Sequence, residues 1–194
     1  MNHPQLYLAS GSPRRRELLA QLGVSFDIIR ADIDETPLPG ESVEAYVLRL
    51  AREKALAGWR AAGEPAQPVL GADTTVAYAG RILGKPLDAD DARAMLADLS
   101  GSTHSVLTAV AVCVAGAVEV TLSTSSVRFM PLSAAQIDAY VASGEPLDKA
   151  GAYGIQGWGG LFVSWMDGSF TGVMGLPVHE TGQLLARYGL GHLA

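Results

Sequence analysis

Two long runs of β-branched residues, separated by one short break, most constrain the fold of this 194-residue chain. The runs cover Ser105–Val114 and Val118–Phe129, and Ala115-Gly116 lies in the break between them. Strand-forming runs on either side of a glycine-containing turn predict an antiparallel pair. The chain is therefore expected to contain a sheet that includes a long hairpin.

Helical segments and shorter strands occupy the rest of the chain. Ser12 and Pro13 have the residue types preferred at a helix start, and Ser133 with Gln136 forms a capping box at another start. A glycine-rich loop covers Gly151–Gly160. The mixture predicts an α/β fold with a mixed sheet. The expected helices are Pro13–Leu22, one from about Ser42, Ala89–Leu99, one from Ser133 and Pro177–Tyr188, and the expected shorter strands are Leu6–Ala9, Phe26–Arg30, Pro68–Tyr78, Arg81–Leu83 (after a turn at Ala79-Gly80) and Leu161–Trp165.

The composition favours one compact domain over residues 1–194. The chain is 48% hydrophobic and 18% charged, which is enough for a substantial core and argues against disorder. No stretch resembles a linker, so we expect a single domain with two lobes.

Charge and cysteine content limit the environment and the partners. The net charge of −6 disfavours nucleic acid as a partner. The longest apolar run, Ala109–Val118, is interrupted by Gly116 and is shorter than the roughly 20 residues of a membrane span. Cys113 is the only cysteine and lies among valines, which favours a buried hydrophobe in a reducing cytoplasm. An anionic substrate would then need a locally positive pocket.

Three arginines occupy the first turn of the first expected helix, where cations are unfavourable. On a helical wheel, Arg15 falls within the leucine stripe, Arg14 lies at its edge and Arg16 lies opposite. A surface position accounts for Arg16. For Arg14 and Arg15, an anion at the helix start accounts for both anomalies, because free backbone N–H groups and guanidinium groups together bind phosphate.

Lys54 interrupts a second helical pattern. It lies at the centre of an apolar stripe on the helix that starts near Ser42. The stripe consists of Val43, Tyr46, Val47, Leu50 and Ala57. Burying a lone ammonium is costly. Two interpretations stay open: either Lys54 extends to solvent at the helix end, or this end of the stripe faces a polar cleft that holds an anion.

Two carboxylates are candidates for chemistry. Asp73 directly follows the apolar segment Pro68–Ala72, and α/β proteins place active-site groups beyond the carboxyl ends of such strands. Asp is also a common turn residue, and Glu35, in an acidic loop, is either solvated or functional. Together Glu35 and Asp73 are candidates to hold a magnesium ion that carries phosphate oxygens.

Several familiar motifs are absent from the sequence. Gly80 and Gly84 enclose too few residues for a P-loop, and Pro86 stands where Ser or Thr is required. Lys85 is still available as a phosphate ligand. The histidines lack the spacing of a zinc site, and neither a G-x-S-x-G elbow nor a dinucleotide-binding glycine motif is present.

At these residues the sequence resembles the Maf-like nucleotide pyrophosphatases, from Leu6 to about Tyr188. Each segment that carries the resemblance is short, but their order and spacing together are specific, and they coincide with the anomalies described above. The segments are Ala9-Ser10-Gly11-Ser12-Pro13-Arg14-Arg15, Asp34-Glu35, Ala51-Arg52-Glu53-Lys54-Ala55, Gly71-Ala72-Asp73-Thr74, Gly84-Lys85-Pro86, Leu99-Ser100-Gly101 and Ala152-Tyr153-Gly154-Ile155-Gln156-Gly157.

The resemblance implies a two-lobed fold similar to that of the inosine triphosphate pyrophosphatases, with the active site in the cleft. It implies hydrolysis between the α- and β-phosphates of a nucleoside triphosphate, a divalent cation (Mg or Mn) as cofactor, and a homodimer. It assigns Glu35 and Asp73 to the metal, with Asp73 also as the general base or the group that positions the attacking water; which carboxylate is the base and which is chiefly a metal ligand stays open. The residues that it implies for triphosphate binding are Ser10, Arg14, Arg15, Lys54 and Lys85.

The resemblance also distinguishes two branches of the family, one similar to a dTTP/UTP enzyme and one that prefers 7-methyl-GTP. The second branch has Trp, Gln and Glu at the positions of Arg14, Thr74 and Gln156. This chain matches the pyrimidine branch at all three positions. A neutral amide at Gln156 both accepts and donates, which suits the N3–H and carbonyl groups of uracil and thymine. We therefore expect UTP, dTTP and modified relatives such as 5-methyl-UTP as substrates.

Two other functions stay open at this point. One is a pyrophosphatase for 7-methyl-GTP or for many nucleotides, which Arg14, Thr74 and Gln156 oppose. The other is a nucleotide-binding regulator of cell division, for which the carboxylate of Asp73 would have no evident use.

Overall fold

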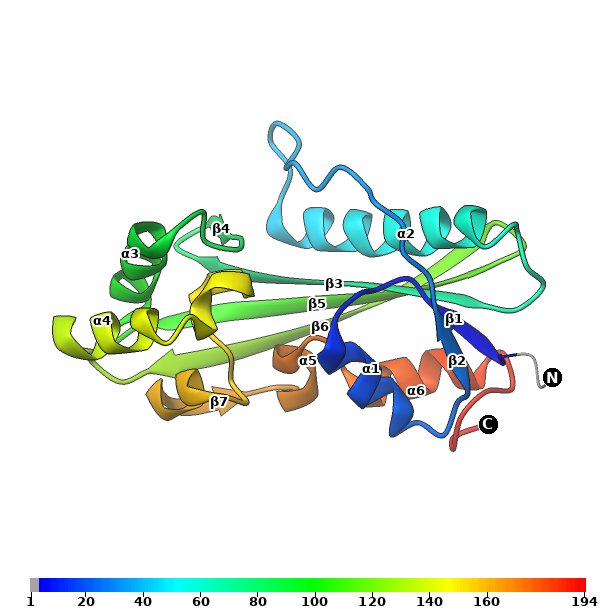
Figure 1. Cartoon of the computed structure of the whole chain (residues 1–194). Coiled ribbons are helices and arrows are strands. Elements are labelled where there is room, and N and C mark those ends of the chain that lie inside the picture. Colours follow the sequence, from blue (N-terminus) through cyan, green and yellow to red (C-terminus); the bar gives the residue numbers. More distant parts are fainter. Residues whose placement is uncertain (1–3) are drawn as a thin grey trace. The chain divides into compact units, whose positions relative to one another are not determined.

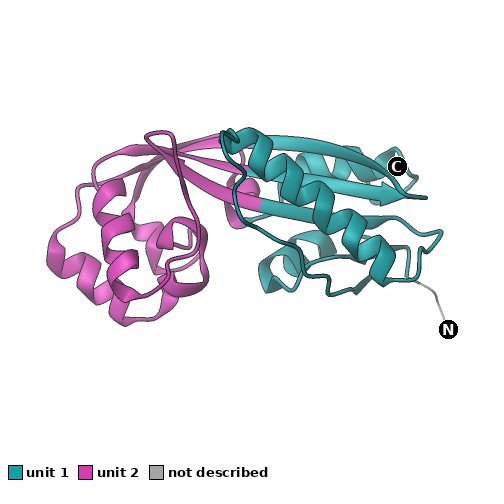
Figure 2. Cartoon of the chain, turned by 90° about the horizontal axis from the view of Figure 1, so that it is seen from above, with its two compact units in different colours: residues 1–73, 108–123, 175–194 teal, residues 74–107, 124–174 magenta. Residues whose placement is uncertain are grey.

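The computed structural model describes residues 4–194, which form two compact units. Figure 2 shows the units in different colours. Unit 1 contains the described residues up to 73, together with 108–123 and 175–194. Unit 2 contains residues 74–107 and 124–174. Each unit therefore combines segments that are distant in the sequence.

The strands belong to one seven-stranded sheet with the order β2-β1-β3-β5-β6-β7, and β4 pairs with β3. Strand β1 is parallel to β2 and β3, whereas the pairs β3–β4 and β6–β7 are antiparallel. The predicted α/β fold with a mixed sheet is confirmed. The strands are β1 (Leu6–Leu8), β2 (Phe26–Ile28), β3 (Val69–Tyr78), β4 (Arg81–Leu83), β5 (Thr103–Val114), β6 (Ala117–Phe129) and β7 (Val163–Asp167).

Both predicted hairpins turn through an Ala-Gly pair. Ala115 and Gly116, between β5 and β6, have φ angles of 49° and 79°. Ala79 and Gly80, between β3 and β4, have φ angles of 50° and 76°. Two successive positive φ angles are typical of a type I′ turn, whose twist matches that of the flanking strands.

Helices cover both faces of the strands in unit 1. Figure 1 shows α2 (Val43–Ala61) on one face and α1 (Pro13–Ala20) with α6 (Val178–Ala186) on the other. Helix α2 lies very close to β3, because a Cβ atom at Gly71 would be only 2.4 Å from the backbone nitrogen of Ala55. Glycine is thus required at position 71 for this approach.

Unit 2 contains three helices and three short 3-10 turns, and its core is aromatic. Helix α3 (Ala89–Leu99) contacts α4 (Ala134–Ala142), and an ion pair of 2.8 Å between Arg93 and Asp138 links them at the surface. The buried rings of Phe129, Tyr140, Tyr153 and Phe162 lie in one hydrophobic cluster. The remaining elements are η1 (Glu145–Asp148), η2 (Ala150–Ala152), η3 (Trp158–Phe162) and α5 (Phe170–Met174).

The structure corrects several predicted boundaries. Residues 158–162 form η3, so the strand predicted at Leu161–Trp165 begins only at Val163. Gly159 and Gly160 permit the tight turn, and the Gly159 N–H bonds to a carboxylate instead of a neighbouring strand. Helix α5 was not predicted. The predicted ends at Leu22, Arg30 and Tyr188 were also wrong, by two residues each, which is the usual uncertainty of element ends.

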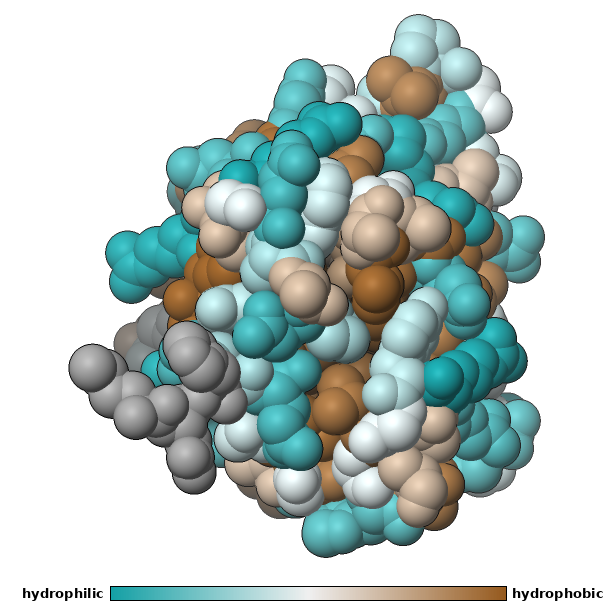
Figure 3. Space-filling model, turned by 90° about the vertical axis from the view of Figure 1, so that its right-hand side faces the viewer, coloured by the Kyte–Doolittle hydropathy of each residue, from teal (hydrophilic) through white to brown (hydrophobic). Residues whose placement is uncertain are grey.

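Other sequence predictions concern the surface and the thiol. Cys113 is buried, as predicted, and burial raises the pKa of its thiol. The face of the molecule in Figure 3 shows apolar residues in small patches between hydrophilic ones, which is common on protein surfaces. Among the described residues, no helix is both long enough and apolar enough to cross a membrane.

A buried histidine lies inside the aromatic core of unit 2. His104 is 3% exposed, and its Nε2 atom lies 2.9 Å from the hydroxyl of Tyr153. Its ring meets Phe129 edge to face, with centroids 5.0 Å apart. Within the described part of the chain, Nδ1 has no hydrogen-bond partner. Burial lowers the pKa of His104 from 6.5 to about 4, so the ring is neutral at pH 7.

We predict that His104 makes the folded state sensitive to acid. The unfolded chain binds a proton at this histidine below its ordinary pKa of 6.5, whereas the folded chain binds one only near pH 4. Stability is therefore lost as the pH falls through this window, by about 3 kcal/mol in total. Urea denaturation between about pH 7 and pH 4 should show a smaller loss for His104→Gln than for the unchanged protein. Equal losses in both proteins would contradict the prediction.

Candidate functional site

The start of α1 gathers polar groups around Ser10 and Arg15. Ser12 is the N-cap, and its Oγ accepts a hydrogen bond of 3.4 Å from the Arg15 backbone N–H. The Ser10 Oγ accepts bonds of 3.3 Å from the Ser12 N–H and from Arg15 Nη1. The Arg15 Nε donates to the carbonyl of Gly175 at 2.9 Å. Ser10 and Arg15 are thus held together at the helix N-terminus, where anions bind favourably.

Arg15 lies in a mixed electrostatic environment. Burial lowers its pKa, as does the charge of Arg14, while the charges of Asp73 and Glu35 oppose the shift. Arg14 is half-buried and Arg16 is exposed, in agreement with the helical wheel. Arg15 is half-buried and lies next to another cation, Arg14, so the binding of an anion here would be favourable.

Lys54 joins the two carboxylates that the sequence singled out. Its ammonium lies 2.7 Å from Asp73 Oδ1 and 2.8 Å from Glu35 Oε1. The side chains of Lys54 and Asp73 are only 14% and 8% exposed, whereas that of Glu35 is 54% exposed. Of the two open interpretations, extension of Lys54 to solvent is wrong. In this structure the apolar stripe ends at a polar site whose anions are the protein's own carboxylates.

Asp73 lies in the middle of β3, which extends to Tyr78 as predicted, so it does not stand beyond the carboxyl end of the strand. The strand continues to Tyr78 because Thr74, Thr75 and Val76 favour extended structure. The close approach of α2 at Gly71 then brings Lys54, the neighbour of Ala55, to the side chain of Asp73. A carboxylate on a central strand is positioned more rigidly than one on a loop.

Residues that we did not predict hold the loop that carries Glu35. The Tyr46 hydroxyl donates to the Glu35 carbonyl at 2.9 Å. Arg49 donates to the Thr36 carbonyl at 3.1 Å and pairs with Glu41 at 2.7 Å. The bond from Arg49 lowers the pKa of Glu41 to about 2. A tyrosine in an apolar stripe was the available signal, because a buried hydroxyl requires a partner.

The carboxylates of Glu35 and Asp73 have the donor type that a divalent cation requires. Both already lie within 2.8 Å of one shared cation, the ammonium of Lys54. Among residues 4–194, no group of three or more His, Cys, Asp or Glu side chains is arranged to hold a metal. Mg²⁺ typically takes one or two carboxylates and completes its shell with water and phosphate oxygens. The pair therefore fits a cation that a phosphate ligand helps to hold.

Unit 2 contains the other three candidate residues. Lys85 and Gln156 are exposed, and Thr74 is half-buried on β3. The carbonyl of Gly84 accepts a bond of 3.0 Å from the N–H of Gly151. This bond joins the segment of Lys85 to the chain that leads to Gln156, so the structure brings two of the sequence motifs together within unit 2.

We predict that removing the ammonium of Lys54 destabilises the protein, because the buried carboxylate of Asp73 would lose the cation that lies 2.7 Å from it. Lys54→Met should lower the free energy of unfolding by about 3 kcal/mol at neutral pH, as measured by urea denaturation. The double variant Lys54→Met/Asp73→Asn should regain much of this loss, since it removes the buried charge as well.

A surface ion pair serves as the control. Arg93 forms an exposed ion pair with Asp138. The substitution Arg93→Met should lower the free energy of unfolding by at most about 1 kcal/mol. The prediction fails if Lys54→Met and Arg93→Met have equally small effects.

The sequence also matches known proteins over nearly its whole length. The model of the family described as Maf-like protein matches residues 5–188. A relative from Chromobacterium violaceum named dTTP/UTP pyrophosphatase is 59% identical, over 97% of this chain and 96% of its own. Relatives with the same name from Dechloromonas aromatica and Aromatoleum aromaticum are 57% and 54% identical, each over 95% of this chain and over 98% and 96% of their own length. These matches show that the chain belongs to the Maf-like family.

Proposed function

We propose that the chain is a nucleoside triphosphate pyrophosphatase that hydrolyses dTTP and UTP to the monophosphate and pyrophosphate. Three relatives that match almost end to end bear the name dTTP/UTP pyrophosphatase. The observation that carries the proposal is the contact of Lys54 with Asp73 and Glu35 in the unit that also holds Arg15. Cations for phosphate and a rigid carboxylate for water are what this reaction needs.

The cations of unit 1 are suited to the charge of a triphosphate. Arg14, Arg15 and Lys54 supply positive charge, and the N-terminus of α1 adds backbone N–H groups near Ser10. The transition state of phosphoryl transfer spreads negative charge over the phosphate oxygens. Fixed donors around those oxygens stabilise it without reorganisation. Lys85 of unit 2 is a further phosphate ligand in this proposal.

Asp73 is the proposed general base. A water oxygen attacks the α-phosphorus while Asp73 accepts its proton, and the bond from the α-phosphorus to the bridging oxygen breaks. Pyrophosphate leaves with the electron pair of that bond. The position of Asp73 within β3, 8% exposed and bonded to Lys54, supports a fixed orientation toward water.

A divalent cation, Mg or Mn, is the proposed cofactor. Glu35 and Asp73 would hold it through their carboxylate oxygens, together with phosphate oxygens of the substrate. When bound, the cation neutralises charge on the phosphates and polarises them toward attack. Lys54, which now neutralises both carboxylates, would then be available to the phosphates.

The proposed selectivity for pyrimidines rests on Arg14, Thr74 and Gln156. The exposed amide of Gln156 can accept from the N3–H of uracil or thymine and donate to a neighbouring carbonyl. A carboxylate at this position would instead suit the donor-rich edge of guanine. Modified pyrimidine triphosphates with the same edge belong to the proposed substrates.

A cytoplasmic homodimer is the remaining part of the proposal: the location rests on the single cysteine, Cys113, and the dimer on the family resemblance alone. We expect a molar mass of about twice the chain's 20.3 kDa by light scattering at assay concentration. A mass equal to one chain would reject the dimer and leave the proposed reaction unaffected.

We predict that a nucleotide panel with magnesium or manganese shows pyrophosphate release from dTTP and UTP. Pyrophosphate and orthophosphate should be assayed separately for every substrate. Little release is expected from the standard purine triphosphates or 7-methyl-GTP, because their bases present a different edge to Gln156. Activity mainly on 7-methyl-GTP would overturn the selectivity, and orthophosphate alone would overturn the assigned bond.

The variant Asp73→Asn controls for contaminating hydrolases. It keeps the shape of the side chain but cannot accept the proton, so kcat for UTP should fall by about 10²–10⁴-fold. UTP should still bind, as measured by titration calorimetry. Full activity in this variant would exclude Asp73 as the base, and binding without turnover in the unchanged protein would favour a nucleotide-binding regulator.

A further inference from the structure

The loop that carries Gln156 is held on both sides by one carboxylate and one tyrosine. Glu145 Oε1 accepts bonds from the Tyr140 hydroxyl at 2.8 Å and from the Gly159 N–H at 3.2 Å. Its Oε2 accepts from the Trp158 N–H at 3.0 Å. On the other side of Gln156, the Gly154 N–H donates to the same Tyr140 hydroxyl at 3.2 Å. Both ends of the short loop around Gln156 therefore meet at one polar centre.

The glycines of this loop reflect the close approach of these side chains. A Cβ atom at position 157 would lie 2.4 Å from Glu145 Oε1, and one at position 159 would lie 2.6 Å from the Tyr140 hydroxyl. A Cβ at Gly154 would lie 2.8 Å from Cε of Lys149. A side chain at position 157 or 159 would require the polar centre to move, and one at position 154 would displace the side chain of Lys149. The glycine-rich sequence thus follows the shape of this centre.

Glu145 itself is held in place and charged. The Lys149 ammonium donates to the Glu145 carbonyl at 2.7 Å and to Asp148 at 2.6 Å, which closes the short turn η1. Burial raises the pKa of Glu145, but the bonds from Tyr140, Trp158 and Gly159 and the charge of Lys149 outweigh it, so that the pKa is lowered. Charge-assisted bonds of this kind are stronger than neutral ones.

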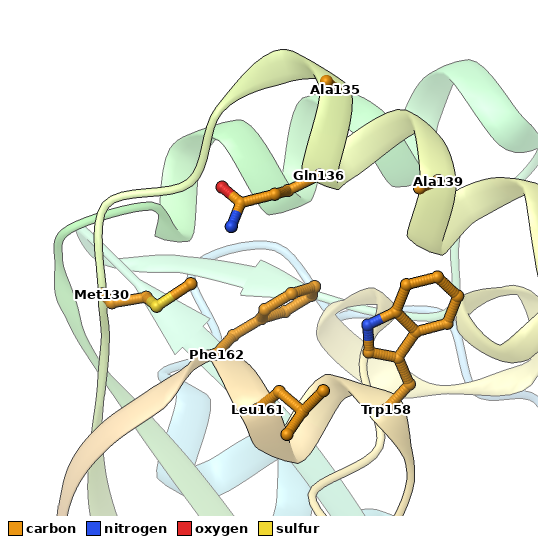
Figure 4. Close-up of a pocket in the computed structure, with 7 residues that line it drawn as sticks. All are labelled: Met130, Ala135, Gln136, Ala139, Trp158, Leu161 and Phe162. Atoms are coloured by element: carbon orange, nitrogen blue, oxygen red, sulfur yellow. The ribbon is translucent and has the colours of Figure 1, made fainter.

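Aromatic contacts also hold the loop that carries Gln156. Tyr140 meets Phe162 edge to face at 5.0 Å and Trp158 at 5.8 Å. Figure 4 shows Trp158 and Phe162 opposite Ala135 and Ala139 of α4, around an apolar pocket of about 360 Å³. Trp158 thus links the loop to α4, the helix that carries Tyr140.

We propose that Glu145 and Tyr140 are positioning residues for Gln156, and that through the loop backbone they determine how well the enzyme recognises the pyrimidine ring. This inference rests on the proposed function. Neither residue needs to touch the nucleotide. They hold the backbone on both sides of the amide, and a small displacement of a recognition group is enough to weaken a substrate contact.

The test combines two substitutions in a cycle. Glu145→Gln keeps the size of the side chain but replaces one acceptor oxygen by a donor that faces backbone N–H groups. We expect kcat/KM for UTP to fall about tenfold, mainly through KM, since the proposed contact binds the base and not the reacting phosphate. In the background of Gln156→Ala, the same change should have less than about a twofold effect, because the group that Glu145 positions is already gone.

A second variant and a control separate positioning from general stability. Tyr140→Phe removes only the shared hydroxyl and keeps the buried ring. If Glu145→Gln folds poorly, Tyr140→Phe replaces it in the cycle and should likewise lower kcat/KM only when Gln156 is present. Ile137→Val, in the core of the same unit, should lower the melting temperature without changing KM for UTP. If Glu145→Gln lowers kcat/KM for UTP equally in the presence of Gln156 and in the Gln156→Ala background, the proposal is overturned.

Hydrogen exchange gives a readout that does not depend on turnover. The amides of Trp158 and Gly159 should exchange faster in Glu145→Gln, while those of β5 stay protected. Unchanged exchange would also overturn the proposal. If the unchanged protein hydrolyses no nucleotide, the proposed function and the recognition of the ring both fail, and exchange alone then decides whether Glu145 orders the loop.

Discussion

Helix α2 lies against β3 without a side chain between them at Gly71, and the arrangement of unit 1 depends on this contact. The backbone of Ala55 occupies the space where a Cβ atom would be. The next residue toward the N-terminus, Lys54, therefore reaches Asp73 two positions further along the strand. A larger residue at position 71 would push the helix away and separate the ammonium from the buried carboxylate. Packing and chemistry are thus linked at one glycine.

Local rules were sufficient for much of the fold and for part of the site. The two Ala-Gly turns, the N-cap at Ser12 and the capping box at Ser133 follow from short-range preferences, and the structure contains all of them. Arg15 and Lys54 were found because each breaks a helical pattern. Residues that are unfavourable for the local structure often mark functional positions.

Other features could not be predicted, because they depend on partners that are distant in the sequence. No periodicity shows that Lys54 meets Asp73, or that Arg15 donates to Gly175, which is 160 residues away. Glu145 looks like a solvated loop acid in the sequence, yet its carboxylate accepts three hydrogen bonds. The turn η3 could not be predicted for the same reason, because the Gly159 N–H donates to that distant carboxylate and not to a neighbouring strand.

The bonds of Arg15 have a consequence for the kinetics of ligand capture. Its Nε and Nη1 atoms donate hydrogen bonds to groups of the protein itself, the carbonyl of Gly175 and the hydroxyl of Ser10. A long, flexible arginine usually loses rotamer entropy when it closes on an anion, but here folding has already restricted the side chain. An incoming anion therefore meets a preorganised guanidinium, and its association should resemble docking to a rigid surface more than induced fit.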